Sequence, residues 1–158
     1  MKVTLITGAS TGIGEAFAKR LAREKHNLLL VARSENKLQK LCDELQTQYG
    51  ITAQYIAVDL MQAGSDKIIF EEAQKRDLQV NWLINNAGIG SGGDLLEYDF
   101  KSITDMMHLN MDNTVALVHR FLPQMRANKS GKIINVGSMA GFMSIGFYRS
   151  PLGRESSV

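Results

Sequence analysis

A cluster of glycines near the amino terminus has the spacing of a loop that binds phosphate. The apolar run Val3–Ile6 leads directly into Thr7-Gly8-Ala9-Ser10-Thr11-Gly12-Ile13-Gly14, and a helical pattern follows. Glycines accept backbone conformations that other residues avoid, and the free N–H groups at the start of a helix attract phosphate oxygens. A tight turn between a strand and a helix is the alternative. The position after the first strand of a β-α-β unit favours nucleotide binding.

An arginine stands where many dinucleotide-binding proteins have an acid. The second apolar run ends Val31-Ala32-Arg33-Ser34, without a carboxylate to accept hydrogen bonds from the adenosine ribose. Arg33 would instead meet a 2′-phosphate through charge-assisted hydrogen bonds, worth ~1.5–3 kcal/mol. A solvated arginine at the start of a helix is the alternative. The sequence therefore favours NADP over NAD as cofactor.

The chain alternates between apolar runs and stretches of helical periodicity. Each run is continuous, which is typical of strands buried on both faces of a parallel sheet. Leu38, Cys42 and Leu45 recur at helical spacing between two runs, and Ser34 is the predicted N-cap of their helix. We predict an α/β fold with right-handed β-α-β units and a doubly wound parallel sheet. The predicted strands are Val3–Ile6, Leu28–Ala32, Ala53–Val58, Val80–Asn85 and Lys132–Val136.

The composition indicates one globular domain and excludes several classes of protein. The chain has 158 residues, of which 44% are hydrophobic, enough for one core. Its 18 basic and 16 acidic residues are mixed along the sequence, so neither nucleic acid nor a membrane is an expected partner, and no metal site is predicted. The single cysteine, Cys42, cannot form a disulfide within the chain. The first apolar run is too short for a signal peptide, so we expect a cytoplasmic protein.

The spacing Gly8-x-x-x-Gly12-x-Gly14 resembles the short-chain dehydrogenase/reductase family. Asn85-Asn86-Ala87-Gly88, at the end of the fourth predicted strand, adds the most specific short motif in the chain. The resemblance implies an NADP-binding Rossmann-type domain over residues 1–148, incomplete because it has five of the family's usual seven strands. It also implies an oxidoreductase that transfers a hydride between its cofactor and a small alcohol or carbonyl substrate.

The resemblance assigns roles to residues on the cofactor side. It implies that Asp59, after the third strand, binds the amino group of the adenine ring; an N-cap of the next helix is the alternative. Members of the family that use NADP often carry a basic residue in the glycine loop, where this chain has Ser10 and Thr11. The Asn85-Asn86 side chains are expected to tie neighbouring strands together. The implied cofactor contacts are Gly8, Ser10, Thr11, Gly12, Ile13, Gly14, Arg33, Asp59, Asn86, Ala87 and Gly88.

Two polar residues are implied to serve catalysis. The longest helical pattern runs roughly from Asp99 to Met125, and the resemblance implies that Asn110 bends this helix and holds a water on a proton-relay path. Asparagine is a poor helix former, and a polar residue on a solvated face is the alternative. Ser138 follows the fifth strand, where the family has a substrate-orienting serine. A serine that only forms a turn is the alternative there.

The chain departs from the family where the proton donor should stand. The family places a tyrosine thirteen residues after the serine and a lysine four residues further on, because both side chains must project from one helix face. Counting from Ser138 gives Pro151 and Glu155, and none of the four tyrosines is followed by a lysine at that spacing. We therefore expect an aberrant tail over residues 149–158 and an inactive, truncated enzyme.

Two explanations of the tail stay open, and so do three interpretations of the chain: an enzyme, a nucleotide-binding module and a non-functional fragment. A shifted reading frame near Phe147 would explain the tail, and so would a genuine short protein whose tail evolved separately. The alternatives to an enzyme are a non-catalytic nucleotide-binding module and a non-functional fragment, whose apolar edge strand Lys132–Val136 would invite aggregation. The family commonly pairs through the long helix and the helix after Ser138. Since only the first is present, the sequence argues against a homo-oligomer.

Overall fold

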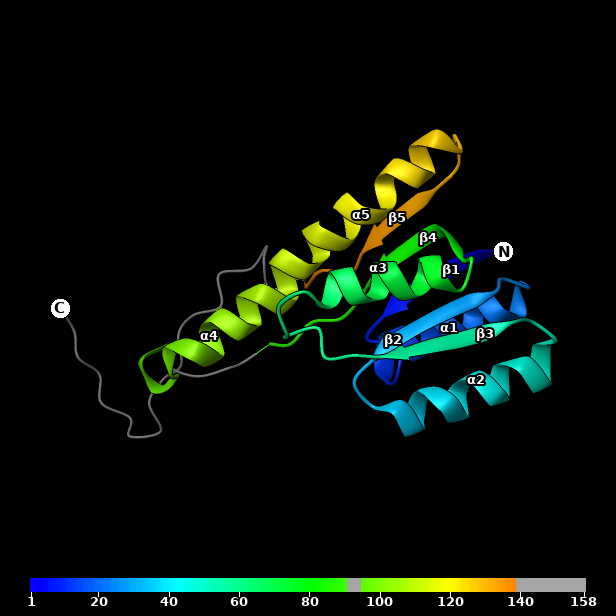
Figure 1. Ribbon diagram of the computed structural model, residues 1–158. Coiled ribbons are helices and arrows are strands. Elements are labelled where there is room, and N and C mark those ends of the chain that lie inside the picture. The colour runs from blue at the N-terminus through cyan, green and yellow to red at the C-terminus, as the bar shows by residue number, and fades with distance from the viewer. Residues whose placement is uncertain (91–94, 139–158) are drawn as a thin grey trace.

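Five parallel strands form one sheet, in which their spatial order is β3-β2-β1-β4-β5 (Figure 1). The computed structural model describes residues 1–90 and 95–138, and all four strand pairs within them are parallel. The chain moves outward from β1 to β3, then returns to the other side of β1 with β4, so the predicted doubly wound α/β fold is confirmed. The strands are β1 Lys2–Thr7, β2 Leu28–Ala32, β3 Ala53–Ala57, β4 Gln79–Asn85 and β5 Lys132–Asn135.

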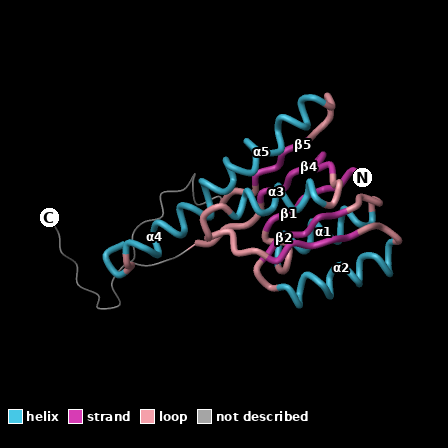
Figure 2. Tube along the Cα trace, in the orientation of Figure 1, coloured by secondary structure: helices cyan, strands magenta, loops and turns pink. Residues whose placement is uncertain are grey.

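Helices cover both faces of the sheet, and in Figure 2 the strands lie between them. Helices α1 (Gly12–Arg23) and α2 (Glu35–Tyr49) bury their apolar sides on one face. Helices α3 (Ser65–Lys75) and α5 (Asn113–Ala127) do so on the other face. None of the helices in the described part of the chain is long and apolar enough to cross a membrane.

Strand β2 shows why the apolar runs are continuous. All five of its residues are buried, because successive side chains point to opposite faces and both faces are covered by helices. Leu28 and Leu30 belong to the core beneath α1 and α2, whereas Leu29 and Val31 belong to the core beneath α3 and α5. The same prediction is wrong for β5, whose residues are only partly buried or exposed. Strand β5 is an edge of the sheet within the described residues, so it has a neighbour on one side only.

The predicted long helix is interrupted by one wider turn. Helix α4 (Phe100–Met107) continues into a π-helical segment, η2 (His108–Asp112), and then into α5. A π turn accommodates an extra residue and changes the direction of the side chains that follow it. Asn110 lies at the middle of this segment. At the amino end, the Asp99 carboxylate caps α4 by accepting from the Ser102 N–H at 2.8 Å, and hydrogen bonds from Ser102 lower the pKa of Asp99.

Cys42 lies in the core between α2 and the sheet, as its spacing predicted, and is 2% exposed. Burial away from water disfavours the thiolate and, with the nearby Asp43 charge, raises the pKa of the Cys42 thiol to about 12. A raised pKa means that the native state holds the proton more tightly than the unfolded state. The associated stabilisation is therefore complete below about pH 9, the ordinary value, and is lost as the pH rises toward 12.

We expect Cys42 to resist thiol reagents while the protein is folded. At pH 8 the native thiol is protonated and covered, so modification by a disulfide reagent should proceed only through unfolding and accelerate on addition of denaturant. Time courses with and without urea measure this. Above pH 9 the free energy of unfolding should fall more steeply in the wild type than in Cys42→Ala. Rapid stoichiometric modification of the folded protein at pH 8 would contradict the burial of this side chain.

Candidate functional site

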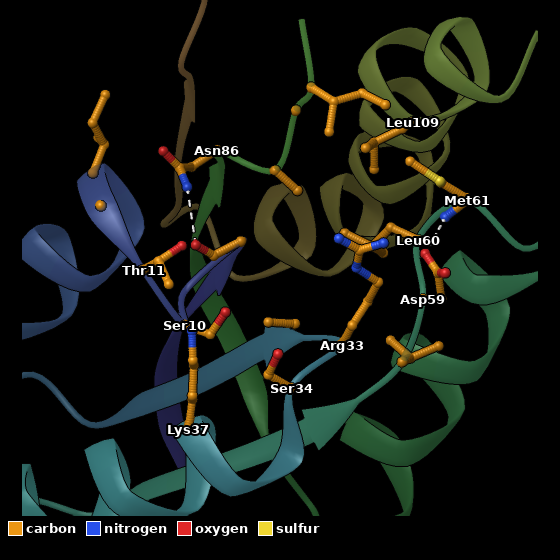
Figure 3. A pocket seen from close by; sticks show the side chains of 18 residues that line it. Ser10, Thr11, Arg33, Ser34, Lys37, Asp59, Leu60, Met61, Asn86 and Leu109 are labelled. Carbon is orange, nitrogen blue, oxygen red and sulfur yellow. Dashed lines mark hydrogen bonds between the residues drawn. The ribbon is translucent and has the colours of Figure 1, made fainter. Parts of the chain in front are cut away.

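A cavity of about 490 Å³ lies at the carboxyl ends of β1 to β4 (Figure 3). Ligands of open α/β sheets bind where the strand order reverses, and here the reversal falls between β1 and β4. The lining combines four segments that are far apart in the sequence. They are Gly8 and Ser10–Ile13 after β1, Ala32–Ser34 with Lys37 after β2, Val58–Met61 after β3, and Asn86–Ile89 after β4, with Leu109 from η2.

The structure brings together ten of the eleven predicted cofactor contacts on the walls of this cavity. The exception is Gly14, which is buried behind the glycine loop at the start of α1. Ile13 is 61% exposed, so its apolar side chain offers surface to a ligand. The residues that the family resemblance implied as cofactor contacts meet here because the carboxyl ends of parallel strands lie at one edge of a sheet.

The glycine loop packs so closely against the end of β4 that side chains are excluded at two positions. Gly8 has φ +65°, and a Cβ there would lie 2.9 Å from both the Ala87 Cα and the Asn86 Nδ2. A Cβ on Gly14 would lie 2.3 Å from the Gly8 carbonyl oxygen and 2.6 Å from the Asn86 Nδ2. Both glycines are therefore required for the loop to take this shape, apart from any contact with a ligand.

Thr7 and Asn86 form the joint between the glycine loop and β4. The Asn86 amide donates to the Thr7 carbonyl oxygen at 3.0 Å and to the Gly8 carbonyl oxygen at 3.4 Å. In return, the Thr7 hydroxyl oxygen accepts from the backbone N–H groups of Asn86 and Ala87, each at 3.0 Å. Asn85 extends the tie to the next strand, since its amide donates to Asn135 Oδ1 at 2.9 Å. The asparagines thus tie neighbouring strands as predicted, whereas the role of Thr7 was not predicted from the sequence.

Asp59 stands on the wall that follows β3. Its carboxylate accepts from the Met61 N–H at 3.0 Å, which fixes the turn after the strand. The alternative role as N-cap of the next helix is wrong, because α3 begins at Ser65 with Gly64 as its N-cap. Asp59 lines the cavity together with Leu60 and Arg33 (Figure 3).

Arg33 and Lys37 give the part of the cavity that follows β2 a positive charge. Both side chains line the cavity and are exposed. Ser34 between them is the N-cap residue of α2, as predicted by position, but its side chain makes no capping hydrogen bond. Lys37 was missed in the sequence; it lies in the first turn of α2, the helix that follows Arg33.

Two asparagines of the π-helical region hold the loops that line the cavity. The Asn110 amide donates to the Ile89 carbonyl oxygen at 2.8 Å, and its Oδ1 accepts from the Ile89 N–H at 3.0 Å. Asn113 is buried; its amide donates to the Leu60 carbonyl oxygen, and its Oδ1 accepts from the Ser65 hydroxyl at 3.0 Å. Asn110 is therefore not merely a polar residue on a solvated face, and Asn113 is a site residue that the sequence did not reveal.

A second cavity, of about 450 Å³, adjoins the first beyond the end of β4. Ala87, Gly88 and Ile89 line both cavities. The two predicted catalytic residues, Asn110 and Ser138, line the second one, so the structure brings them to the same cavity. A serine hydroxyl here can donate a hydrogen bond to the oxygen of a carbonyl or alcohol group.

The residues present fit a nucleotide with several phosphate groups. The glycine loop lines the cavity with backbone at the start of α1, where free N–H groups can donate to phosphate oxygens. Arg33 and Lys37 add two cations to the lining. No group of three or more His, Cys, Asp or Glu residues able to hold a metal ion occurs within residues 1–90 and 95–138. Pro151, Glu155 and the predicted tail over residues 149–158 lie outside the described residues.

Fold and site together define a Rossmann-type α/β domain with a cavity at its strand ends, and the chain belongs to the short chain dehydrogenase family, whose sequence model matches residues 2–149. The ketoacyl reductase HetN of Nostoc sp. is 32% identical over 146 residues, which cover 92% of this chain and 50% of HetN. The chain spans about half the length of the curated relatives it matches.

Solved structures agree with the sequence comparison. A short-chain dehydrogenase from Sphingobium yanoikuyae in complex with NADPH superposes with a TM-score of 0.84 at 32% identity, covering 90% of this chain and 55% of that one. The L-sorbose reductase of Gluconobacter frateurii, complexed with NADPH and L-sorbose, superposes with a TM-score of 0.86 at 29% identity, covering 92% of this chain and 56% of that one. The family resemblance and the Rossmann-type fold are thus confirmed.

Proposed function

We propose that the cavity at the strand ends binds NADP(H), and that the chain forms the nucleotide-binding part of an oxidoreductase acting on an alcohol/carbonyl pair. The observation that carries the cofactor preference is Arg33, which lines the cavity at the end of β2. The nearest acid along the chain, Glu35, accepts from the Tyr55 hydroxyl at 3.3 Å and does not line this cavity. A guanidinium binds phosphate through parallel N–H donors, whereas a carboxylate would repel it.

The other walls support the same ligand. Backbone N–H groups at the start of α1 suit the pyrophosphate, and Asp59 suits the amino group of an adenine ring. NADPH is the ligand of the related structures from Sphingobium yanoikuyae and Gluconobacter frateurii. The preference for NADP also favours reduction of a carbonyl over oxidation of an alcohol.

The substrate side of the site orients the reacting group. When bound, NADPH supplies the hydride that reduces a carbonyl carbon. The Ser138 hydroxyl, at the second cavity, donates to the carbonyl oxygen and so polarises that bond. Asn110 forms two hydrogen bonds with Ile89, which lines both cavities. These bonds hold the shared wall in place and so fix the position of the substrate relative to the cofactor.

The printed sequence favours a second candidate function, a nucleotide-binding module without catalysis. Pro151 and Glu155 stand where the family has its tyrosine and lysine. Without a positioned phenol, the proton for the carbonyl oxygen must come from water. Positioned acid–base catalysis is commonly worth ~10²–10⁴-fold in rate, so this chain alone should turn over slowly or not at all.

A titration of the purified 158-residue chain with NADPH and with NADH, followed by nicotinamide fluorescence, tests the proposal. We expect saturable binding of both, with NADPH the tighter ligand. Arg33→Gln should weaken NADPH binding by about 10–100-fold, the value of a hydrogen bond between charged groups, and leave NADH binding nearly unchanged. Arg23→Gln, at an exposed arginine in the last turn of α1, is the matched control and should alter neither.

The outcomes separate the parts of the proposal. Binding of neither cofactor would contradict the nucleotide site, and equal affinities would contradict the preference for NADP. A turnover assay on the same sample with carbonyl substrates and NADPH distinguishes the two candidate functions. Binding without turnover favours the module, whereas measurable oxidation of NADPH favours catalysis by this chain.

A further inference from the structure

The nucleotide cavity is flanked by two cations that approach it from different directions. Arg33 precedes α2, and Lys37 lies about one helical turn further along the chain. In Figure 3 the Arg33 side chain extends toward Asp59 and Leu60, whereas the Lys37 side chain extends from α2 toward the glycine loop at Ser10. The two residues therefore cover the wall from the β3 side to the β1 side.

Neither cation has a carboxylate within ion-pair distance in the described part of the chain. Within residues 1–90 and 95–138, no ion pair involves Arg33 or Lys37. The carboxylates of α2 face elsewhere: Glu35 accepts from the Tyr55 hydroxyl, and Asp43 accepts from the Gln39 amide at 2.9 Å. Two cations that line one cavity, without an ion-pair partner among the described residues, suit a ligand that carries a negative charge.

The glycine loop contributes hydroxyl groups but no cation. Ser10 and Thr11 line the cavity from the loop, and Ser34 lines it from the start of α2 with a side chain that makes no capping hydrogen bond. We propose that Lys37 supplies, from α2, the cation that the glycine loop of this chain lacks, so that the 2′-phosphate of NADP(H) is held between Lys37 and Arg33. This assignment rests on the proposed binding of NADP(H) and makes Lys37 a second determinant of cofactor choice.

The charges match. A phosphate monoester carries a charge of about −1.5 to −2 at neutral pH, which one arginine cannot balance. The Arg33 guanidinium provides a planar pair of donors, and the Lys37 ammonium provides a compact charge on a long, adjustable side chain. NADH has a hydroxyl at the 2′ position, so its binding leaves the mutual repulsion of the two cations in place.

Binding measurements on four variants test the assignment. The ligands are NADPH and NADH, followed by fluorescence, and adenosine 2′,5′-bisphosphate and adenosine 5′-phosphate, followed by calorimetry. We expect Lys37→Gln to weaken NADPH and the bisphosphate about tenfold, the low end for a charged hydrogen bond at an exposed site, with NADH and the monophosphate unchanged. Lys37→Arg should restore most of the loss, because it keeps the charge.

Lys40→Gln is the matched control, because Lys40 is an exposed lysine of α2 that does not line the cavity. It should change no affinity. Arg33→Gln with Lys37→Gln should abolish the discrimination between NADPH and NADH. An unchanged NADPH affinity in Lys37→Gln, or an equal loss for NADPH and NADH, would overturn the assignment. The wild-type titrations judge the proposed function separately, since a wild type that binds neither cofactor or prefers NADH refutes that function before any variant is compared.

Discussion

A Gly14→Ala variant is expected to bind NADPH at least about 10²-fold more weakly than the wild type. The added methyl group would stand 2.3 Å from the Gly8 carbonyl oxygen and 2.6 Å from the Asn86 Nδ2. Both neighbours are held, because Asn86 bonds to Thr7 and Gly8 across the joint with β4. The glycine loop must therefore move, and the loss of two charge-assisted hydrogen bonds to phosphate corresponds to roughly 10²-fold in affinity.

The same change should lower the free energy of unfolding by ~1–3 kcal/mol, the usual cost of overpacking. Urea unfolding and NADPH titration measure the two effects. Gly50→Ala is the control: Gly50 is the C-cap of α2, with φ +62° and no atom near the added Cβ. It should lose about 1 kcal/mol through backbone strain and keep its affinity for NADPH. If Gly14→Ala binds NADPH like the wild type, the close packing of the loop is not required for binding.

Replacing Asn113 with alanine is expected to lower the free energy of unfolding by about 3 kcal/mol. Asn113 is 3% exposed and joins the Leu60 carbonyl oxygen to the Ser65 hydroxyl, two groups that belong to other elements. Its removal leaves both partners buried without hydrogen bonds, at ~1–3 kcal/mol each, partly relieved by entering water. The affinity for NADPH should also fall, because Leu60 lines the cavity.

Urea unfolding of four variants separates the contributions of the two side chains to the free energy of unfolding. Ser65→Ala should lose less than Asn113→Ala, and the double variant should lose less than the sum, because the two side chains are coupled. Asn128→Ala, at the exposed C-cap of α5, should change the free energy of unfolding by less than about 0.5 kcal/mol. A loss in Asn113→Ala no larger than that of Asn128→Ala would show that the buried hydrogen bonds contribute nothing.

Local patterns predicted most of the fold. Strand β2 was readable because burial on both faces leaves an unbroken apolar run, and its predicted bounds, Leu28–Ala32, are those observed. The glycine loop and Arg33 were predicted from their positions directly after strands, whereas the role of Asp59 was implied only by the family resemblance. The predicted strands Ala53–Val58 and Lys132–Val136 each proved one residue too long at the end. Hydrogen bonding, not hydrophobicity, decides where a strand stops.

Three residues of the site could not be predicted from hydrophobic periodicity or motif spacing. Thr7 serves the site by accepting from Asn86 and Ala87, which stand about eighty positions later in the chain. Asn113 serves it through Leu60 and Ser65, which are also distant in sequence. Lys37 belongs to the site because its side chain extends from α2 toward the glycine loop and lines the cavity. In the sequence, none of the three differs from an ordinary polar residue, because the groups that each one meets are known only from the structure.

The sequence by itself determined the alternation of strands and helices, the glycine loop after β1 and the charge at the end of β2. These features depend on residue types over a few neighbouring positions, which periodicity and spacing record. The tertiary structure alone decided the joints made by Thr7 and Asn113 and the shared cavity of Arg33 and Lys37, whereas a bend at Asn110 was already implied by the family resemblance. Those features depend on buried hydrogen bonds between elements, and such bonds have directions and partners that no local pattern encodes.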